Sequence, residues 1–128
     1  MANAAARKGN QEGEIPVEQH FIARGFRRVY RLGKQGSKDK GDIGGIDDVC
    51  IEVKNRGTYS IGPWMKELAV EKAYKAARIG ALIVKPRGVG KTRVDQWWVV
   101  MTVGDFQQLL IEAGYGPYEE PGVNDGGG

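Results

Sequence analysis

The sequence predicts an α/β domain with a mixed β-sheet and helices on its faces. Two apolar runs of strand length, Ala81–Lys85 and Trp97–Val103, indicate buried strands. Val49–Asn55 alternates between apolar and polar residues, which indicates a strand with two different faces. An alanine-rich stretch of helical length, Pro63–Arg78, lies between these strands. Helical and extended segments that alternate in this way are typical of a sheet covered by helices.

The length and composition suit one domain. The chain has 128 residues, and 41% of them are hydrophobic, which is enough for a single core. We expect residues 14–113 to fold, and residues 1–13 and 114–128 to form flexible tails, because both ends are polar or rich in glycine. The single cysteine, Cys50, suits a reducing compartment. No apolar run reaches membrane length and no signal peptide is evident, so we expect a cytoplasmic protein.

The N-terminal half contains one predicted helix and three predicted extended segments. The helix covers Pro16–Arg24, because proline is favoured at a first helical position and Gly25 can cap the C-terminal end. Phe26–Leu32 mixes aromatic, β-branched and basic residues and is predicted to be a strand. After a polar loop, Asp42–Ile46 and Val49–Asn55 have the pattern of a hairpin.

The C-terminal half contains two predicted helices. The first covers Pro63–Arg78, and we expect Gly80 to stop it. The second covers Asp105–Ala113, with Asp105 as its N-cap. The two apolar strands lie between these helices, and this order completes the α/β pattern.

Three residues of the hairpin carry the candidate chemistry. Side chains alternate along a strand, so Glu52 and Lys54 share one face while Ile51 and Val53 occupy the other. Asp42 and Glu52 offer the oxygen ligands that a hard cation such as Mg²⁺ prefers, and the Val53 carbonyl is a further candidate ligand. Lys54 can offset negative charge in a transition state. This combination suits metal-assisted hydrolysis of a phosphodiester.

The register of the hairpin tests this interpretation. A two-residue loop at Asp47-Asp48 would pair Ile43 with Glu52 and would turn Asp42 to the wrong face of the sheet. A longer loop or a bulge would bring Asp42 round to the metal. Gly44-Gly45 is a suitable place for it, so we expect an irregularity there.

Basic residues flank the hairpin on both sides. The net charge is +3, and the positive charges gather in two segments that could line a groove for a nucleic-acid backbone. An alternative is a pair of solvated loops. The candidate DNA-binding residues are Arg27, Arg28, Arg31, Lys34, Lys38, Arg87 and Lys91.

The pattern resembles the PD-(D/E)xK nuclease superfamily, with Gly41-Asp42 in place of the usual Pro-Asp. Within it, the sequence is most similar to phage-encoded and archaeal-type Holliday junction resolvases. The matching segments are GE ending at residue 14, ARGF (23–26), KDKGDIGGI (38–46), VCIEVKN (49–55), PWMKE (63–67), KPRGVG (85–90) and WWVVMTV (97–103).

The resemblance implies a restriction-endonuclease-like fold and a metal-dependent DNA endonuclease. In that family the acidic pair binds Mg²⁺ or Mn²⁺, the lysine assists hydrolysis, and a homodimer cuts two strands of a four-way DNA junction. A further acidic residue often lies on the first helix. Glu14 fits this role best, and Glu18, one turn further along, is the rival. If the protein is phage-encoded, it would act in the host cytoplasm.

Two alternatives stay open on the sequence. One is a structure-specific or end-processing nuclease of the same fold with a different DNA substrate. The other is a DNA-binding module of this fold that has lost catalysis, against which the joint presence of Asp42, Glu52 and Lys54 argues.

Overall fold

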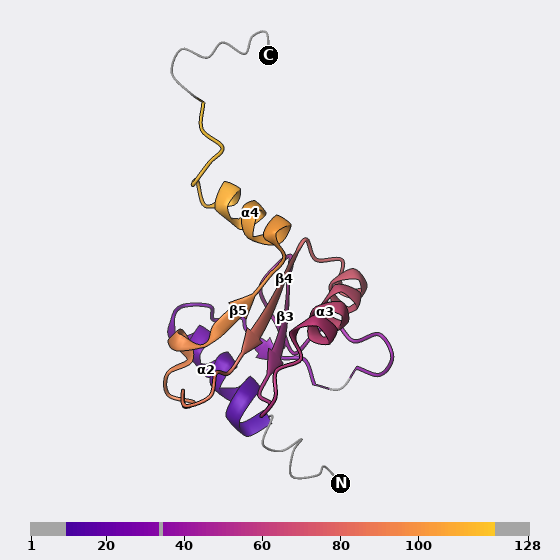
Figure 1. Ribbon diagram of the computed structural model, residues 1–128, viewed down its shortest axis with the longest axis vertical. Helices are drawn as coiled ribbons and strands as arrows, with labels where there is room; N and C mark the ends of the chain where they lie inside the picture. The colour runs from indigo at the N-terminus through magenta and orange to yellow at the C-terminus, as the bar shows by residue number, and fades with distance from the viewer. Residues whose placement is uncertain (1–9, 34, 120–128) are drawn as a thin grey trace.

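The fold is a five-stranded mixed sheet with three helices packed against it, seen in a computed structural model that describes residues 10–33 and 35–119 (Figure 1). The strands are β1 (Tyr30–Arg31), β2 (Ile43–Gly44), β3 (Val49–Lys54), β4 (Ile79–Val84) and β5 (Trp98–Val100), and they lie in this order across the sheet. β3 and β4 run parallel, and the other neighbouring pairs are antiparallel.

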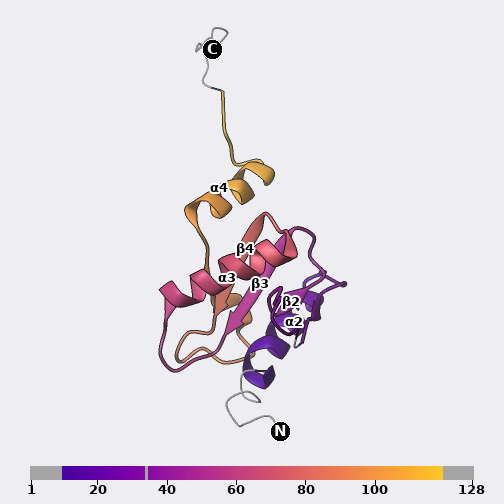
Figure 2. The same ribbon diagram turned by 90° about the vertical axis from the view of Figure 1, so that its right-hand side faces the viewer.

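The helices lie on both sides of the central strands. The chain forms η1 (Asn10–Glu14), α2 (Ile15–Ala23), α3 (Ile61–Lys75), the short η2 (Val94–Gln96) and α4 (Val103–Glu112). α3 lies across one face of β3 and β4, as Figure 2 shows, while α2 lies on the other side of the sheet. None of the helices in the described part of the chain is both long and apolar enough to cross a membrane.

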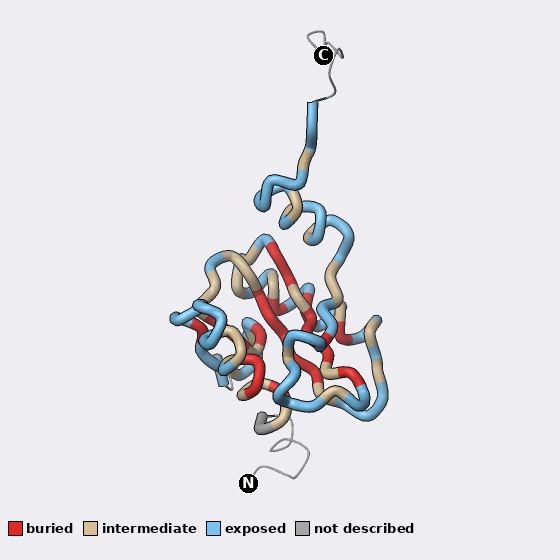
Figure 3. Tube along the Cα trace, turned by 90° about the vertical axis from the view of Figure 1, so that its left-hand side faces the viewer, coloured by how far each residue is buried: buried red, intermediate tan, exposed pale blue. Residues whose placement is uncertain are grey.

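The alternation of side chains in β3 divides the core into two clusters. Ile51 and Val53 pack with Val17 of α2 on one face, and Cys50 packs with Leu68 of α3 on the other. Figure 3 shows the buried residues concentrated along the central strands. The predicted two-faced strand is therefore confirmed, and Glu52 and Lys54 lie on the face that α3 covers.

The predicted strand Phe26–Leu32 is wrong for most of its length. Phe26 packs edge-on against Phe21, with ring centroids 5.3 Å apart, and its N–H donates to the Phe21 carbonyl (2.9 Å). The N–H of Val29 donates to the Phe26 carbonyl (3.2 Å), which closes a turn. Only β1 is left to pair with β2.

Two predictions for the C-terminal half, the helix stop at Gly80 and the N-cap at Asp105, are wrong. Gly80 does not stop α3, because the helix ends at Lys75 and Ala76 takes the left-handed conformation. Gly80 is part of β4, where an added Cβ would lie 3.3 Å from Leu68, so its role is close helix–strand packing. Asp105 is not the N-cap of α4, because the side chain of Thr102 accepts the hydrogen bond from the Asp105 N–H.

Asp105 serves instead as a link between elements. Its carboxylate accepts hydrogen bonds from the Gly80 N–H (2.8 Å) and from Lys72 Nζ (3.0 Å). This ion pair occupies the amine of Lys72.

The chain ends differ in part from the predicted tails. Residues 1–9 and 120–128 lie outside the described residues. Asn10–Glu14 forms a helical turn that runs directly into α2, and a Cβ added at Gly13 would lie 3.5 Å from the Asn55 side chain. The folded part therefore begins before residue 14.

Candidate metal centre

The β2–β3 connection sets the register that the site requires. β2 and β3 are joined by four residues, 45–48, and Ile43 pairs with Ile51, so the two-residue loop does not occur. Gly45 has a φ of +94°, and an added Cβ would lie 2.0 Å from the Arg28 carbonyl oxygen. The irregularity expected at Gly44-Gly45 is therefore present, and only glycine fits the second position.

A second irregularity turns the Asp42 side chain toward β3. The N–H of Asp42 donates to the Ile51 carbonyl (2.8 Å), although Ile51 is already the partner of Ile43. Two residues of one strand therefore face one residue of the next, which is the arrangement of a bulge. As a result Asp42 Oδ2 accepts the N–H of Val53 (2.8 Å), the residue between Glu52 and Lys54.

The Val53 carbonyl points to the same side of β3 as Asp42. Backbone groups of successive residues in a strand point to opposite neighbours, and the N–H and C=O of one residue point the same way. The Ile51 carbonyl accepts from Asp42, while the Lys54 carbonyl accepts from Lys85 (3.0 Å) on the β4 side. β2 ends before it can pair with Val53, so strand geometry leaves this carbonyl on the Asp42 side of β3.

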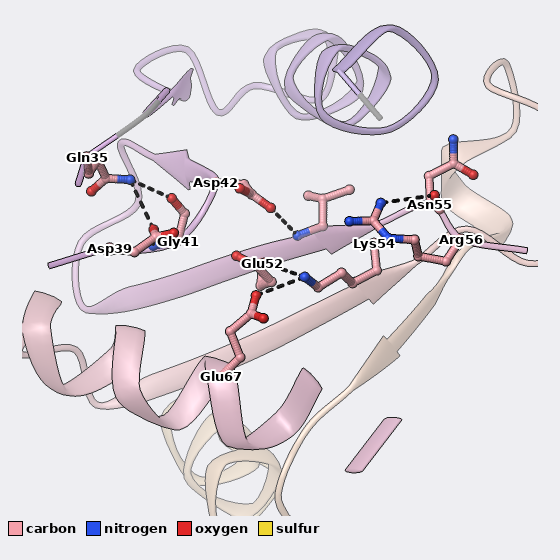
Figure 4. Close-up of polar contacts among 10 residues, drawn as sticks. Gln35, Asp39, Gly41, Asp42, Glu52, Lys54, Asn55, Arg56 and Glu67 are labelled. Atoms are coloured by element: carbon pink, nitrogen blue, oxygen red, sulfur yellow. Dashed lines mark hydrogen bonds and ion pairs between the residues drawn. The ribbon is translucent and has the colours of Figure 1, made fainter. Parts of the chain in front are cut away.

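Glu52 and Lys54 are buried together beneath α3. Glu52 is 4% exposed and Lys54 is 8% exposed. Lys54 Nζ lies 3.1 Å from Glu52 Oε2 and 2.8 Å from Glu67 Oε1 of α3. Figure 4 shows Asp42 on one side of Glu52 and Glu67 on the other.

The acidic groups have shifted pKa values, raised at Glu52 and Asp42 and lowered at Glu67 by its hydrogen bond with Glu52. Burial, together with the neighbouring Glu67 carboxyl, raises the pKa of Glu52 to about 11. Burial also raises the pKa of Asp42, although the hydrogen bond from the Val53 N–H opposes the shift. Glu52 Oε1 is buried and has no hydrogen-bond partner among residues 10–33 and 35–119. Carboxylates held this close need either protons or a cation.

The additional acidic residue favoured from the sequence, Glu14, lies near Asp42. Burial first, and the charge of Asp42 second, raise the pKa of Glu14 to about 7. Its rival, Glu18, instead lies 3.9 Å from the Arg31 guanidinium. Glu14 is therefore the acid that the structure brings toward the hairpin.

Two acidic residues of α3 were missed in the sequence. One carboxylate oxygen of each of Glu52, Glu67 and Glu71 lies within 4.8 Å of the other two, and Asp42 is not part of this group. A sequence signal existed, because Trp64, Leu68 and Glu71 follow helical spacing and all three are buried. An acid in an apolar stripe points to a polar site beneath the helix.

The predicted DNA-binding residues are mostly exposed, but they differ in their contacts. Arg27 and Arg28 line a shallow cavity of about 320 Å³ beside the β2–β3 connection. The Arg87 guanidinium donates to the Gly57 carbonyl and lies over the Tyr59 ring. Lys38 and Lys91 are exposed, and Lys34 lies outside the described residues.

Cys50, Trp97 and Trp98 make contacts within the fold. Cys50 is fully buried, and burial raises the pKa of its thiol to about 12, as expected for an inert core cysteine. Trp97 is buried, and its indole N–H donates to the Gly90 carbonyl (3.1 Å). Trp98 is 51% exposed and contacts the Tyr59 ring edge-on.

Comparison with known proteins adds no relative: no family model, curated protein or solved structure matches the chain.

Proposed function

We propose that the protein is a divalent-metal-dependent DNA endonuclease with a restriction-endonuclease-like fold. The observation that carries the proposal is the hydrogen bond from the Val53 N–H to Asp42 (2.8 Å). This contact brings together Asp42, Glu52 and Lys54, which hydrolysis of a phosphodiester would require at one place.

The donor set fits a hard cation. Asp42, Glu52 and the Val53 carbonyl offer only oxygen, and Glu52 Oε1 lacks a partner within the described residues. Mg²⁺ is held in proteins by few carboxylates and retains several waters, so two carboxylates and one carbonyl suffice. When bound, such an ion polarises a phosphate and lowers the pKa of a coordinated water.

The chain's own residues supply the rest of the chemistry. Lys54 is held by Glu52 and Glu67, so its ammonium is fixed beside the place where negative charge would develop on the phosphate. Glu14, whose pKa is raised to about 7 by burial, is suited to accept a proton near neutral pH. Arg27 and Arg28 can hold the DNA backbone beside the hairpin.

The favoured substrate is a four-way DNA junction, on the resemblance to junction resolvases. The test is incubation of the purified protein with a four-way junction and a linear duplex of the same sequence, in Mg²⁺ and in EDTA. We expect Mg²⁺-dependent cutting of the junction in preference to the duplex. Equal cutting of both would favour the general structure-specific or end-processing nuclease, and binding without cutting would favour the inactive module.

A junction resolvase must cut two strands, so we propose a symmetric homodimer with two centres. Two surfaces expose apolar residues for such an interface, namely Val70 and Tyr74 on α3, and Trp98 and Val99 on the edge strand β5. Light scattering of the purified protein should give twice the chain mass of 14.0 kDa. A strict monomer that only nicks a junction would rule out the resolvase while leaving the nuclease chemistry intact.

A further inference from the structure

The three carboxylates between β3 and α3 form a cluster beside the proposed catalytic ion. Glu67 and Glu71 are four residues apart on α3 and therefore project from the same helix face. Glu52 meets them from β3, and one oxygen of each residue lies within 4.8 Å of the other two. The cluster thus has ligands from two rigid elements.

Two oxygens of the cluster are buried without a partner. Glu52 is 4% exposed and Glu71 is 3% exposed, and the Oε1 atom of each has no hydrogen-bond partner in the described part of the chain. A buried carboxylate oxygen without a partner is unfavourable, because it has lost its hydration. Both unpartnered atoms therefore point to an absent proton or cation.

The charge of the cluster favours a divalent cation. Lys54 approaches the other oxygen of Glu52 and one oxygen of Glu67, so it compensates one of the three negative charges. With all three carboxylates ionised, as they would be around a bound cation, the single ammonium leaves two negative charges uncompensated. One divalent ion would neutralise these two charges.

The separation of the oxygens suits an ion of this class. Ligands on opposite sides of an ion are separated by twice the metal–oxygen distance, which is about 4.2 Å for Mg²⁺ and roughly 4.6–5.2 Å for Ca²⁺. The oxygens of the cluster lie within 4.8 Å of one another, so their separations do not exceed the Ca²⁺ span and come within about 0.6 Å of the Mg²⁺ span. Small side-chain rotations would therefore complete the site.

A hydrated ion can reach the cluster from solvent. A cavity of about 430 Å³ opens beside α3 and is lined by Ser37, Asp39, Glu67, Val70, Glu71 and Tyr74. The Glu67 side chain is 44% exposed, so this carboxylate lies at the mouth of the site while Glu52 and Glu71 lie deeper.

We propose that Glu52, Glu67 and Glu71 bind a second divalent cation, and that Glu52 is shared between it and the ion at Asp42. The second site stands on the acidic cluster, whereas the shared use of Glu52 in catalysis rests on the proposed function. Paired ions of this kind stabilise both the attacking and the leaving oxygen of a phosphodiester.

The test is a titration of the full chain with Mn²⁺, followed by electron paramagnetic resonance of the free ion and by calorimetry. We expect two bound Mn²⁺ in the wild type, one in Glu71→Gln and one in Asp42→Asn. Glu112→Gln, which changes an exposed acid on α4, is the matched control and should bind two. If Glu71→Gln does not fold, as judged by circular dichroism, Glu67→Gln at the exposed rim takes its place.

Each result separates the second site from the proposed function. Loss of one ion in Glu71→Gln supports the site, even if the wild type cuts no DNA, in which case the nuclease proposal is wrong. Unchanged stoichiometry and affinity in Glu71→Gln would overturn the site, even if the wild type cuts DNA with Mg²⁺. A wild type that binds no Mn²⁺ would overturn it too, because protons would then occupy the cluster.

Discussion

Replacing Glu52 by glutamine should stabilise the metal-free protein at alkaline pH, although Glu52 belongs to the proposed metal centre. The pKa of Glu52 is raised from 4.5 to about 11, chiefly by burial. Between these two values the folded protein keeps a proton that the unfolded chain releases. Stability from this group is therefore present below pH 4.5 and is lost as the pH rises toward 11. Glutamine carries no such proton and avoids the loss.

The magnitude follows from the pKa difference. Each pH unit above 4.5 costs about 1.4 kcal/mol, so the penalty at pH 8 has an upper limit of about 5 kcal/mol. Relaxation of the side chains reduces this limit, and the glutamine retains an oxygen that can accept from Lys54, 3.1 Å away in the wild type. We expect Glu52→Gln to gain about 2 kcal/mol or more at pH 8 and nearly nothing at pH 5.

Urea unfolding in EDTA at pH 5 and pH 8 measures this difference directly. Glu112→Gln is the control with the opposite sign, because Arg78 holds the pKa of Glu112 below its usual range and its loss should be slightly destabilising. Addition of Mn²⁺ should then stabilise the wild type more than Glu52→Gln, since a ligand stabilises only the form that binds it. A variant that is less stable than the wild type by the same amount at both pH values would refute the reasoning.

Three further predictions concern the lysine, the connection and the basic residues. Lys54→Met should slow single-turnover cleavage by about 100-fold while Mn²⁺ still binds; an unchanged rate would mean that the lysine only neutralises its carboxylate neighbours. Gly45→Ala should lower the free energy of unfolding by more than about 2 kcal/mol, because its Cβ would lie 2.0 Å from the Arg28 carbonyl, whereas Gly62→Ala has open space and should not; equal urea midpoints for the two would contradict this. The logarithm of DNA affinity should fall steeply with the logarithm of salt concentration, and Arg27→Ala should reduce the slope by about 1; a flat dependence in fluorescence anisotropy would show that the basic residues do not contact phosphates.

The parts of the site that depend on local pattern were predictable from the sequence. Strand alternation alone places Glu52 and Lys54 on one face and Ile51 and Val53 on the other, and the structure confirms it. The glycines predicted the irregularity at Gly44-Gly45, because only glycine allows the close contact at Gly45.

The parts that depend on tertiary contacts were not predictable in this way. Glycine commonly ends a helix, and for this reason Gly80 was expected to stop α3. The parallel pairing of β4 with β3 instead places Gly80 inside a strand. Aspartate is a common N-cap residue, but the carboxylate of Asp105 instead accepts hydrogen bonds from Lys72 and from the Gly80 N–H. Glu71 could be noticed as an acid in an apolar stripe, yet its approach to Glu52 depends on how α3 crosses the sheet.

The central claim is that Asp42 and Glu52 form a metal-dependent centre for phosphodiester hydrolysis. Single-turnover cleavage of a labelled four-way junction in Mg²⁺ tests it most directly, with Asp42→Asn compared with Asp47→Asn, an exposed aspartate in the same connection. We predict that Asp42→Asn abolishes cleavage but still binds the junction, because an amide is a poor ligand for a hard cation. We predict that Asp47→Asn cuts at the wild-type rate. Undiminished cleavage by Asp42→Asn would contradict the claim.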